Sequence, residues 1–213
     1  MLGPGDWRAG LEHSLLIAGT TMVCATVLGT LAAVELSSPR FPARRLVVVI
    51  PVSPLAVPVI ITAVGTYLLF APLGLASTFR GIIVAHTVLA SPFVVVTVGA
   101  SLAGFDRALM RAAAICGARP LVAFRAVMLP LILPGVLSGA AFAFVTSFDE
   151  VVVALFLASA QQRTLPIVMF TGLREQLSPA ITAAATLMMS ISILLLILAE
   201  ALRRRAARRT RVG

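Results

Sequence analysis

Two adjacent carboxylates, Asp149 and Glu150, are the strongest candidates for chemistry because they interrupt an apolar stretch of the sequence. A charged side chain inside such a stretch costs about 3 kcal/mol or more in a membrane and normally faces a polar cavity or a partner. Carboxylates combined with aromatic faces suit an organic cation. The aromatic candidates on the same side of the molecule are Phe148, Tyr67 and Trp7.

Adjacent residues of a helix point about 100° apart, so the two carboxylates cannot share one face equally. We favour Asp149 as the one that faces a substrate pathway. Three other roles stay open for the pair: contact with another protein, pairing with Arg163, or a place among lipid headgroups.

The chain offers no recognisable catalytic site. It contains neither GxxxxGK[ST] nor HExxH, and its only histidines are His13 and His86. Neither histidine has a matching nucleophile motif, and His86 is expected to be a packing or interface residue. The two cysteines, Cys24 and Cys116, do not suggest a disulfide framework. We therefore expect no enzyme activity, no metal site and no cofactor bound to this chain.

The segment 104–135, GFDRALMRAAAICGARPLVAFRAVMLPLILPG, is too polar to span a membrane and too regular to be a loose linker. Apolar and small residues follow helical spacing from Ala108 to Cys116, and Gly117 ends that pattern. Pro120 suits the first turn of a second helix, whose apolar face would carry Leu121 and Phe124. The sequence predicts a helix, a glycine turn and a second helix.

The elements that must position these residues are membrane spans. The chain has 213 residues, of which 60% are hydrophobic and only 12% charged, and its mean hydropathy is +1.06. One soluble core could not bury so much apolar surface. A spanning helix needs about 20 mostly apolar residues, and the stretches that meet this need are 14–36, 46–71, 81–103, 131–158 and 180–202. The fold class is therefore all-α, a polytopic membrane protein with about five transmembrane helices.

Arginine distribution predicts the orientation of the spans. Thirteen of the 17 arginines lie in three alternating segments, 37–45, 104–130 and the tail 203–213. Basic residues concentrate in cytoplasmic loops, so these segments and the C-terminus should be cytoplasmic and the N-terminus outside. The net charge of the chain is +9. The arginine-rich tail is expected to contact anionic lipid headgroups. Such a charge can also suggest nucleic-acid binding, but no aromatic or motif context supports that interpretation.

The 104–135 segment resembles the cytoplasmic signature of ABC importer permeases, in which E-A-A is followed by three residues, Gly, nine residues and I-x-L-P. Here the signature reads Arg111-Ala112-Ala113, then Gly117, then Val127-Met128-Leu129-Pro130. All spacings match, while Val127 replaces isoleucine and Arg111 replaces the glutamate. The resemblance implies that residues 104–130 couple the permease to a separate ATPase, and that Arg111 loses or rearranges one contact of the family. The alternative is that the whole loop is an amphipathic helix pair that binds lipid headgroups.

Further stretches at 13–36, 85–106 and 147–170 look like the second permease subunit of spermidine/putrescine importers. The resemblance implies a bacterial inner-membrane permease for polyamines. It also implies four kinds of partner: an ATPase dimer that binds the ATP, a second permease subunit, an external solute-binding protein and the bilayer. Related permeases carry iron, thiamine, sulfate or molybdate, and the acidic pair mildly favours a cation over an anion.

The whole chain, 1–213, is expected to form a single transmembrane domain. Members of the polyamine branch usually have one more helix before the segment that corresponds to 13–36. This chain would then be a shortened permease, a fragment, or a sequence whose start has been placed too late.

Overall fold

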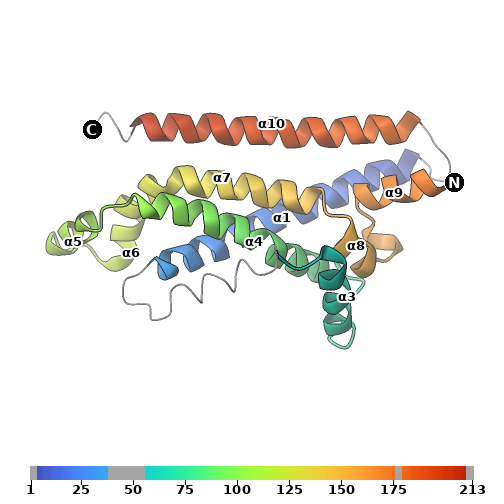
Figure 1. Ribbon diagram of the computed structural model, residues 1–213, viewed down its shortest axis with the longest axis horizontal. Helices are drawn as coiled ribbons and strands as arrows, with labels where there is room; N and C mark the ends of the chain where they lie inside the picture. Colours follow the sequence, from blue (N-terminus) through green and yellow to red (C-terminus); the bar gives the residue numbers. More distant parts are fainter. Residues whose placement is uncertain (1–3, 38–55, 176–178, 210–213) are drawn as a thin grey trace.

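The computed structural model describes residues 4–37, 56–175 and 179–209, and these residues form helices and turns without a strand. Figure 1 shows long helices running side by side, with short helices at both ends of the molecule. The helices are α1 (Pro4–Leu36), α3 (Val59–Phe70), α4 (Phe79–Ala103), α5 (Ala108–Ile115), α6 (Pro120–Ala123), the π-helix η2 (Phe124–Met128), α7 (Leu129–Phe148), α8 (Val152–Leu157), the 3-10 helix η3 (Ala160–Gln162), α9 (Leu165–Glu175) and α10 (Pro179–Arg209).

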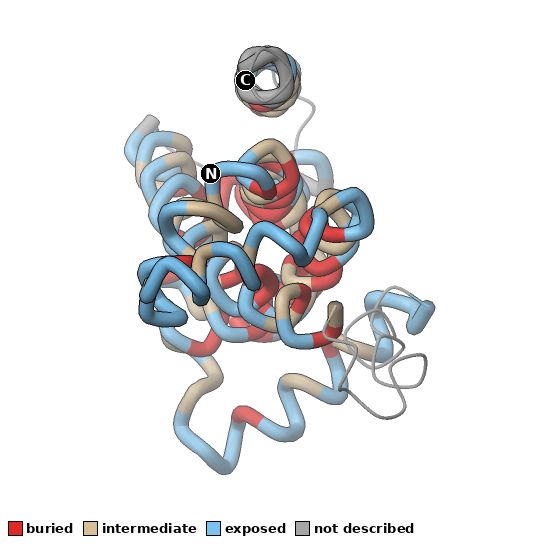
Figure 2. The backbone as a smooth tube through the Cα atoms, turned by 90° about the vertical axis from the view of Figure 1, so that its left-hand side faces the viewer, coloured by how far each residue is buried: buried red, intermediate tan, exposed pale blue. Residues whose placement is uncertain are grey.

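The centre of the bundle is a close packing of α1, α4 and α7, and small residues make it possible. A Cβ atom placed on Gly29 of α1 would lie 2.6 Å from the Cβ of Val94 on α4. On α7, a Cβ on Gly139 would lie 2.6 Å from Thr97 Oγ1, and one on Gly135 would lie 2.7 Å from the Thr97 carbonyl oxygen. Small residues let helix backbones approach closely in lipid, where apolar burial gives no driving force between helices. Buried residues accordingly gather where these helices face one another (Figure 2).

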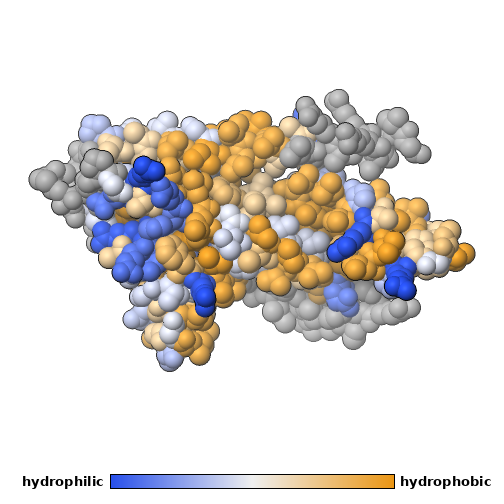
Figure 3. Space-filling view, turned by 180° about the vertical axis from the view of Figure 1, so that it is seen from behind, coloured by the Kyte–Doolittle hydropathy of each residue, from blue (hydrophilic) through white to orange (hydrophobic). Residues whose placement is uncertain are grey.

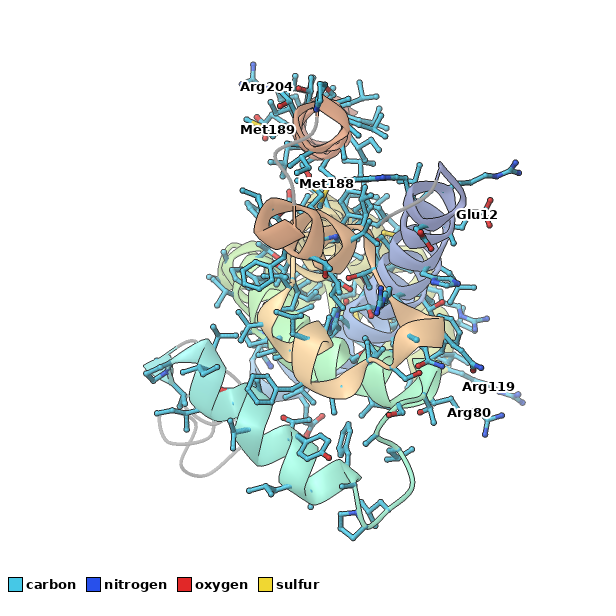
Figure 4. All side chains as sticks on the ribbon, turned by 90° about the vertical axis from the view of Figure 1, so that its right-hand side faces the viewer. Glu12, Arg80, Arg119, Met188, Met189 and Arg204 are labelled. Carbon is cyan, nitrogen blue, oxygen red and sulfur yellow. The ribbon has the colours of Figure 1, made fainter. Side chains whose placement is uncertain are left out.

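Helix α10 packs on the bundle through one face only. It lies beside α7 and α9 and stands to one side of the other helices in Figure 2. Met188 is 6% exposed and points towards the bundle, whereas the next residue, Met189, is 64% exposed and points away (Figure 4). The exposed face of α10 is apolar, which suits contact with lipid or with another membrane protein.

Four helical stretches among the described residues are long and apolar enough to span a membrane: Gly5–Leu36, Phe79–Ala103, Pro120–Phe148 and Pro179–Ala201. They contain or closely match the predicted spans 14–36, 81–103 and 180–202. The predicted second span, 46–71, is wrong as a continuous helix. Pro58 has an extended ψ of 128°, so α3 begins only at Val59, and most of the stretch before it lies outside the described residues. Proline has no backbone N–H to donate to a helix. The extended conformation of Pro58 separates α3 from the residues before it.

The predicted fourth span, 131–158, lies within a helical stretch that starts earlier, and its predicted end is wrong. The second helix of the 104–130 loop continues through η2 into α7, so the helical stretch starts at Pro120. At the other end α7 stops at Phe148, and a new short helix begins at Val152. Across this break, Glu150 Oε1 accepts a hydrogen bond of 2.8 Å from the Val153 N–H in the first turn of α8.

The two ends of the bundle are formed by different helices. The end of α10, α5 and α6 lie at one end, whereas the start of α1, α8 and α9 lie at the other (Figure 1). Hydrophobic side chains dominate the middle of the face in Figure 3, and hydrophilic ones gather towards the ends. The 104–130 loop and the end of α10 thus lie at the same end of the molecule. Of the other predicted arginine-rich segments, 38–45 and 210–213 lie outside the described residues.

Candidate functional site

The helix–turn–helix predicted around Gly117 is present. Asp106 Oδ1 accepts a hydrogen bond of 2.8 Å from the Ala108 N–H and so starts α5. At its end, the N–H groups of Gly117 and Ala118 donate to the carbonyls of Ala114 and Ala113, each at 3.0 Å. This bonding is the Schellman motif, which requires a left-handed residue after the helix. Gly117 supplies it with a φ of +81°.

The second helix of the loop also begins where the sequence predicts. Arg119 has an extended ψ of 151° and Pro120 occupies the first turn of α6. The missing N–H of proline is harmless there, because the first helical N–H groups have no partner within the helix. The turn between α5 and α6 is therefore set by local chemistry on both sides.

The loop presents apolar side chains to the outside. Ile115 is 87% exposed, Leu121 59% and Val122 53%. Of the residues that match the family signature, Arg111, Ala112 and Gly117 are exposed. The remaining signature residues differ in their exposure. Ala113, Val127 and Leu129 are half-buried, and Pro130 is exposed. Exposed apolar residues on a basic loop suit a protein partner better than bulk water.

The π-helix η2 joins this loop to the membrane span. The sequence pattern does not predict it. The Leu129 N–H donates to the Phe124 carbonyl, one residue further back than in an α-helix. The next residue, Pro130, has no N–H and cannot restore the α-helical pattern. π-Bulges of this kind are often found at functional positions.

Asp149 and Glu150 lie at the opposite end of the molecule from this loop, at the break between α7 and α8. Asp149 is exposed, and its backbone N–H donates to the Val145 carbonyl at 3.0 Å as the end of α7. Glu150 is half-buried and is engaged by the Val153 N–H. The break thus separates the two carboxylates: Glu150 accepts a backbone hydrogen bond from α8, and Asp149 is exposed.

The structure differs for some of the neighbours suggested for the acidic pair. Phe148 is 1% exposed and stacks on Phe144 with ring centroids 5.4 Å apart, so it is not available to a ligand. Tyr67 is 42% exposed, and Trp7 packs against the core cluster formed by α1, α7, α9 and α10. Among the described residues, the ion pairs are Arg8 with Glu12 and Arg204 with Glu200, so Arg163 does not pair with Asp149.

A buried contact joins α4 and α7 near the end of α7, and it agrees with the packing or interface role expected of His86. His86 is 1% exposed, and its Nδ1 lies 2.9 Å from the hydroxyl oxygen of Ser147. The sequence offered one signal, a histidine within an apolar span, but not its partner. No group of three or more His, Cys, Asp or Glu side chains in the described part of the chain could hold a metal ion.

Comparison with known proteins agrees with the expected family. The model of the family described as binding-protein-dependent transport system inner membrane component matches residues 25–212. The spermidine/putrescine transport system permease protein PotC of Haemophilus influenzae is 33% identical over 193 residues, covering 91% of this chain and 75% of that protein. The putrescine transport system permease protein PotI of Escherichia coli K12 is 35% identical over 183 residues, covering 83% and 65%.

The fold is also known. A chain of the MetNI methionine ABC transporter in an inward-facing conformation superposes with a TM-score of 0.78 at 21% identity, covering 97% of this chain and 99% of that chain. An amino acid ABC transporter gives a TM-score of 0.69 at 16% identity. The apolar spans, the helix–turn–helix and these matches agree. The chain belongs to the binding-protein-dependent inner membrane component family, the permease subunits of ABC importers, which are transport components and not enzymes.

Proposed function

We propose that this permease carries a polyamine such as spermidine or putrescine into the cell, with Asp149 at the outer mouth of its pathway. The single observation that carries the assignment to a cation is the exposed carboxylate of Asp149 beside a Glu150 that already accepts a hydrogen bond from the Val153 N–H. Its relatives PotC and PotI are named as polyamine permeases. An unpaired carboxylate at the end of a span would attract an ammonium group and would oppose an anion.

The same proposal assigns the 104–130 loop to a partner ATPase on the cytoplasmic side. The exposed apolar residues of α5 and α6 and the turn at Gly117 support this docking role. The complete importer would contain an ATPase dimer, a second permease subunit and an external solute-binding protein. The C-terminus would then lie in the cytoplasm and the N-terminus outside, as the arginine distribution predicts.

Two single substitutions test the role of Asp149. In cells or proteoliposomes that contain the whole importer, Asp149→Asn should lower the rate of labelled putrescine or spermidine uptake by about tenfold, the effect of losing about 1.4 kcal/mol from a charge-assisted contact. Glu150→Gln is the matched control, because the amide oxygen still accepts from Val153 and the fold is kept. The amount of each variant in the membrane is measured alongside.

A solute panel tests the substrate class independently. ATP hydrolysis by the importer with its binding protein should rise with putrescine or spermidine and not with thiamine, iron, sulfate or molybdate. Stimulation by one of the other solutes alone would overturn the polyamine assignment. Equal uptake by the Asp149→Asn variant and the parent protein would remove Asp149 from the pathway.

A further inference from the structure

A pocket of about 670 Å³ opens between α4, α7 and α10. It lies in the half of the bundle that carries α5 and α6, away from the acidic pair at the end of α7 (Figure 1). Its volume falls in the range of small-molecule sites, about 300–1,000 Å³. The polar and aromatic side chains that line it are Thr97, Ser101, Ser138, Phe142, Glu200 and Arg204.

Two hydroxyl groups of the pocket have already donated their protons. Thr97 Oγ1 donates to the Phe93 carbonyl at 2.9 Å, and Ser138 Oγ donates to the Pro134 carbonyl at 3.0 Å. A hydroxyl has one proton and two lone pairs. Both oxygens therefore keep lone pairs for a ligand that donates hydrogen bonds, and neither has a proton left for an anion.

Glu200 supplies a negative charge to the same pocket. It lies within the apolar stretch Pro179–Ala201, where a charged side chain normally faces a polar site or a partner. Arg204, one turn further along α10, donates from Nε to Glu200 Oε1 at 2.7 Å. The two side chains are 37% and 74% exposed, and an ion pair with this exposure contributes little to stability. Another cation can therefore replace the guanidinium group.

An aromatic ring completes the set of groups. Phe142 is 42% exposed and stacks on Phe93 with ring centroids 6.2 Å apart. A cation over such a ring is attracted by its negative face. A carboxylate, hydroxyl lone pairs and an aromatic ring all suit an ammonium group, whereas a phosphate headgroup would meet acceptors that repel it.

We propose that this pocket binds a primary ammonium group, with Glu200 as its counter-ion, Thr97 and Ser138 as acceptors, and Arg204 as the cation that it displaces. In the importer the ammonium group would belong to the transported polyamine, and this part rests on the proposed function. Ser138 lies 11 residues before Asp149, which is about 16 Å along a helix. A four-carbon diamine cannot bridge that distance, so the pocket is a second site on the cytoplasmic side of Asp149.

The test measures whether an amine protects the pocket in the assembled importer. Ala100 is an exposed residue of the pocket, and Ala100→Cys is introduced into a Cys24→Ala, Cys116→Ala background. The complex in nanodiscs, without ATP or binding protein, is labelled with a small neutral methanethiosulfonate. Putrescine should slow the labelling of residue 100. The four-carbon diol of the same length and inorganic phosphate should leave the rate unchanged.

Opposite effects of Glu200 and Arg204 separate a binding site from a structural ion pair. Glu200→Gln should raise the half-protecting concentration of putrescine about tenfold, the effect of losing one charge-assisted hydrogen bond, and Glu200→Asp should restore part of it. Arg204→Gln should lower that concentration about threefold, because it removes a competing cation of modest strength. A purely structural pair would respond in the same direction to both changes, since either one removes it.

The acceptor hydroxyls have a matched control. Thr97→Val and Ser138→Ala should each raise the half-protecting concentration about threefold, as expected for one neutral hydrogen bond. Thr186→Val on α10 should leave it unchanged. The Thr186 hydroxyl donates to the Thr182 carbonyl in the same way, but Thr186 lines a different pocket.

Unchanged labelling with putrescine, or equal effects of Glu200→Gln and Arg204→Gln, would overturn the proposal. Protection by phosphate alone would also overturn it, in favour of an anionic lipid headgroup. Protection should persist in Asp149→Asn, and its loss there would overturn the existence of two separate sites. Size-exclusion chromatography identifies any variant that fails to assemble, and Ser138→Cys then replaces Ala100→Cys as the labelled position.

The outcomes for this pocket and for the proposed function are distinguishable. Protection by putrescine, together with a solute panel that excludes polyamines, would keep the ammonium site and remove the polyamine as the transported solute. ATP hydrolysis stimulated by polyamines without protection of residue 100 would remove the pocket alone.

Discussion

At the scale of single residues, Gly117 has two separable properties: its backbone conformation and its lack of a side chain. Its φ of +81° is left-handed, and a Cβ atom added there would meet nothing within 4 Å in this chain. Substitution should therefore act through the backbone or through a docked partner. A non-glycine residue in this conformation costs about 1–2 kcal/mol, and asparagine tolerates it best.

We expect Gly117→Asn to retain most of the uptake, Gly117→Val to reduce it, and Gly117→Trp to abolish it by blocking the docking surface. Membrane insertion should be normal in all three variants, because residue 117 is exposed and outside the spans. Uptake and the ATPase co-purified with each variant are the measurements. Normal uptake with tryptophan would contradict the assignment of this turn to ATPase docking.

At the scale of helices, the α4–α7 contact depends on Gly135 and Gly139. The two glycines are four residues apart in the sequence and face the same part of α4, around Thr97. A methyl group on Gly135 would meet the Thr97 carbonyl oxygen at 2.7 Å, so the helices would have to separate. Overpacking of this kind costs about 1–3 kcal/mol.

Gly135→Ala should therefore lower the thermal unfolding midpoint of the purified permease in detergent. Gly99→Ala on α4 is the matched control, because a Cβ there meets nothing within 4 Å. In a helix interior alanine is favoured over glycine by about 1 kcal/mol, so the control should be neutral or stabilising. Equal midpoints for the two variants would show that the close contact does not determine stability.

At the scale of the whole molecule, the native cysteines report the orientation of the permease. Cys116 is exposed beside Gly117, whereas Cys24 lies on α1 within the bundle. Glu12 is exposed on α1 (Figure 4), and it lies near the start of α1, at the end of the molecule opposite α5 (Figure 1). The proposed topology therefore predicts opposite accessibility for positions 116 and 12.

An impermeant maleimide should label Cys116 in inside-out vesicles and not in whole cells. Bound ATPase should protect it. A Glu12→Cys variant in a Cys24→Ala, Cys116→Ala background should show the reverse pattern, with labelling in whole cells. Labelling of Cys116 from outside would invert the topology and remove the docking role of the 104–130 loop.

Local chemistry was enough to predict several features from the sequence. Hydropathy over about 20 residues identifies spans such as α4, because lipid requires a whole helix of apolar residues. The turn at Gly117 followed from a glycine after one helical pattern and a proline before the next. The family could also be predicted, because its signature is a spacing within a single loop.

Only the tertiary structure decided the features that depend on residues distant in sequence. The burial of Phe148 depends on α9 and α10, and the partner of His86 lies on another helix. Helix α7 ends at Phe148 although the sequence is apolar again from Val151 onwards, and beyond this break Glu150 accepts a hydrogen bond from the Val153 N–H. A single sequence shows which residues can pack or donate a hydrogen bond, but the helix that lies opposite each of them is set by packing of the whole bundle.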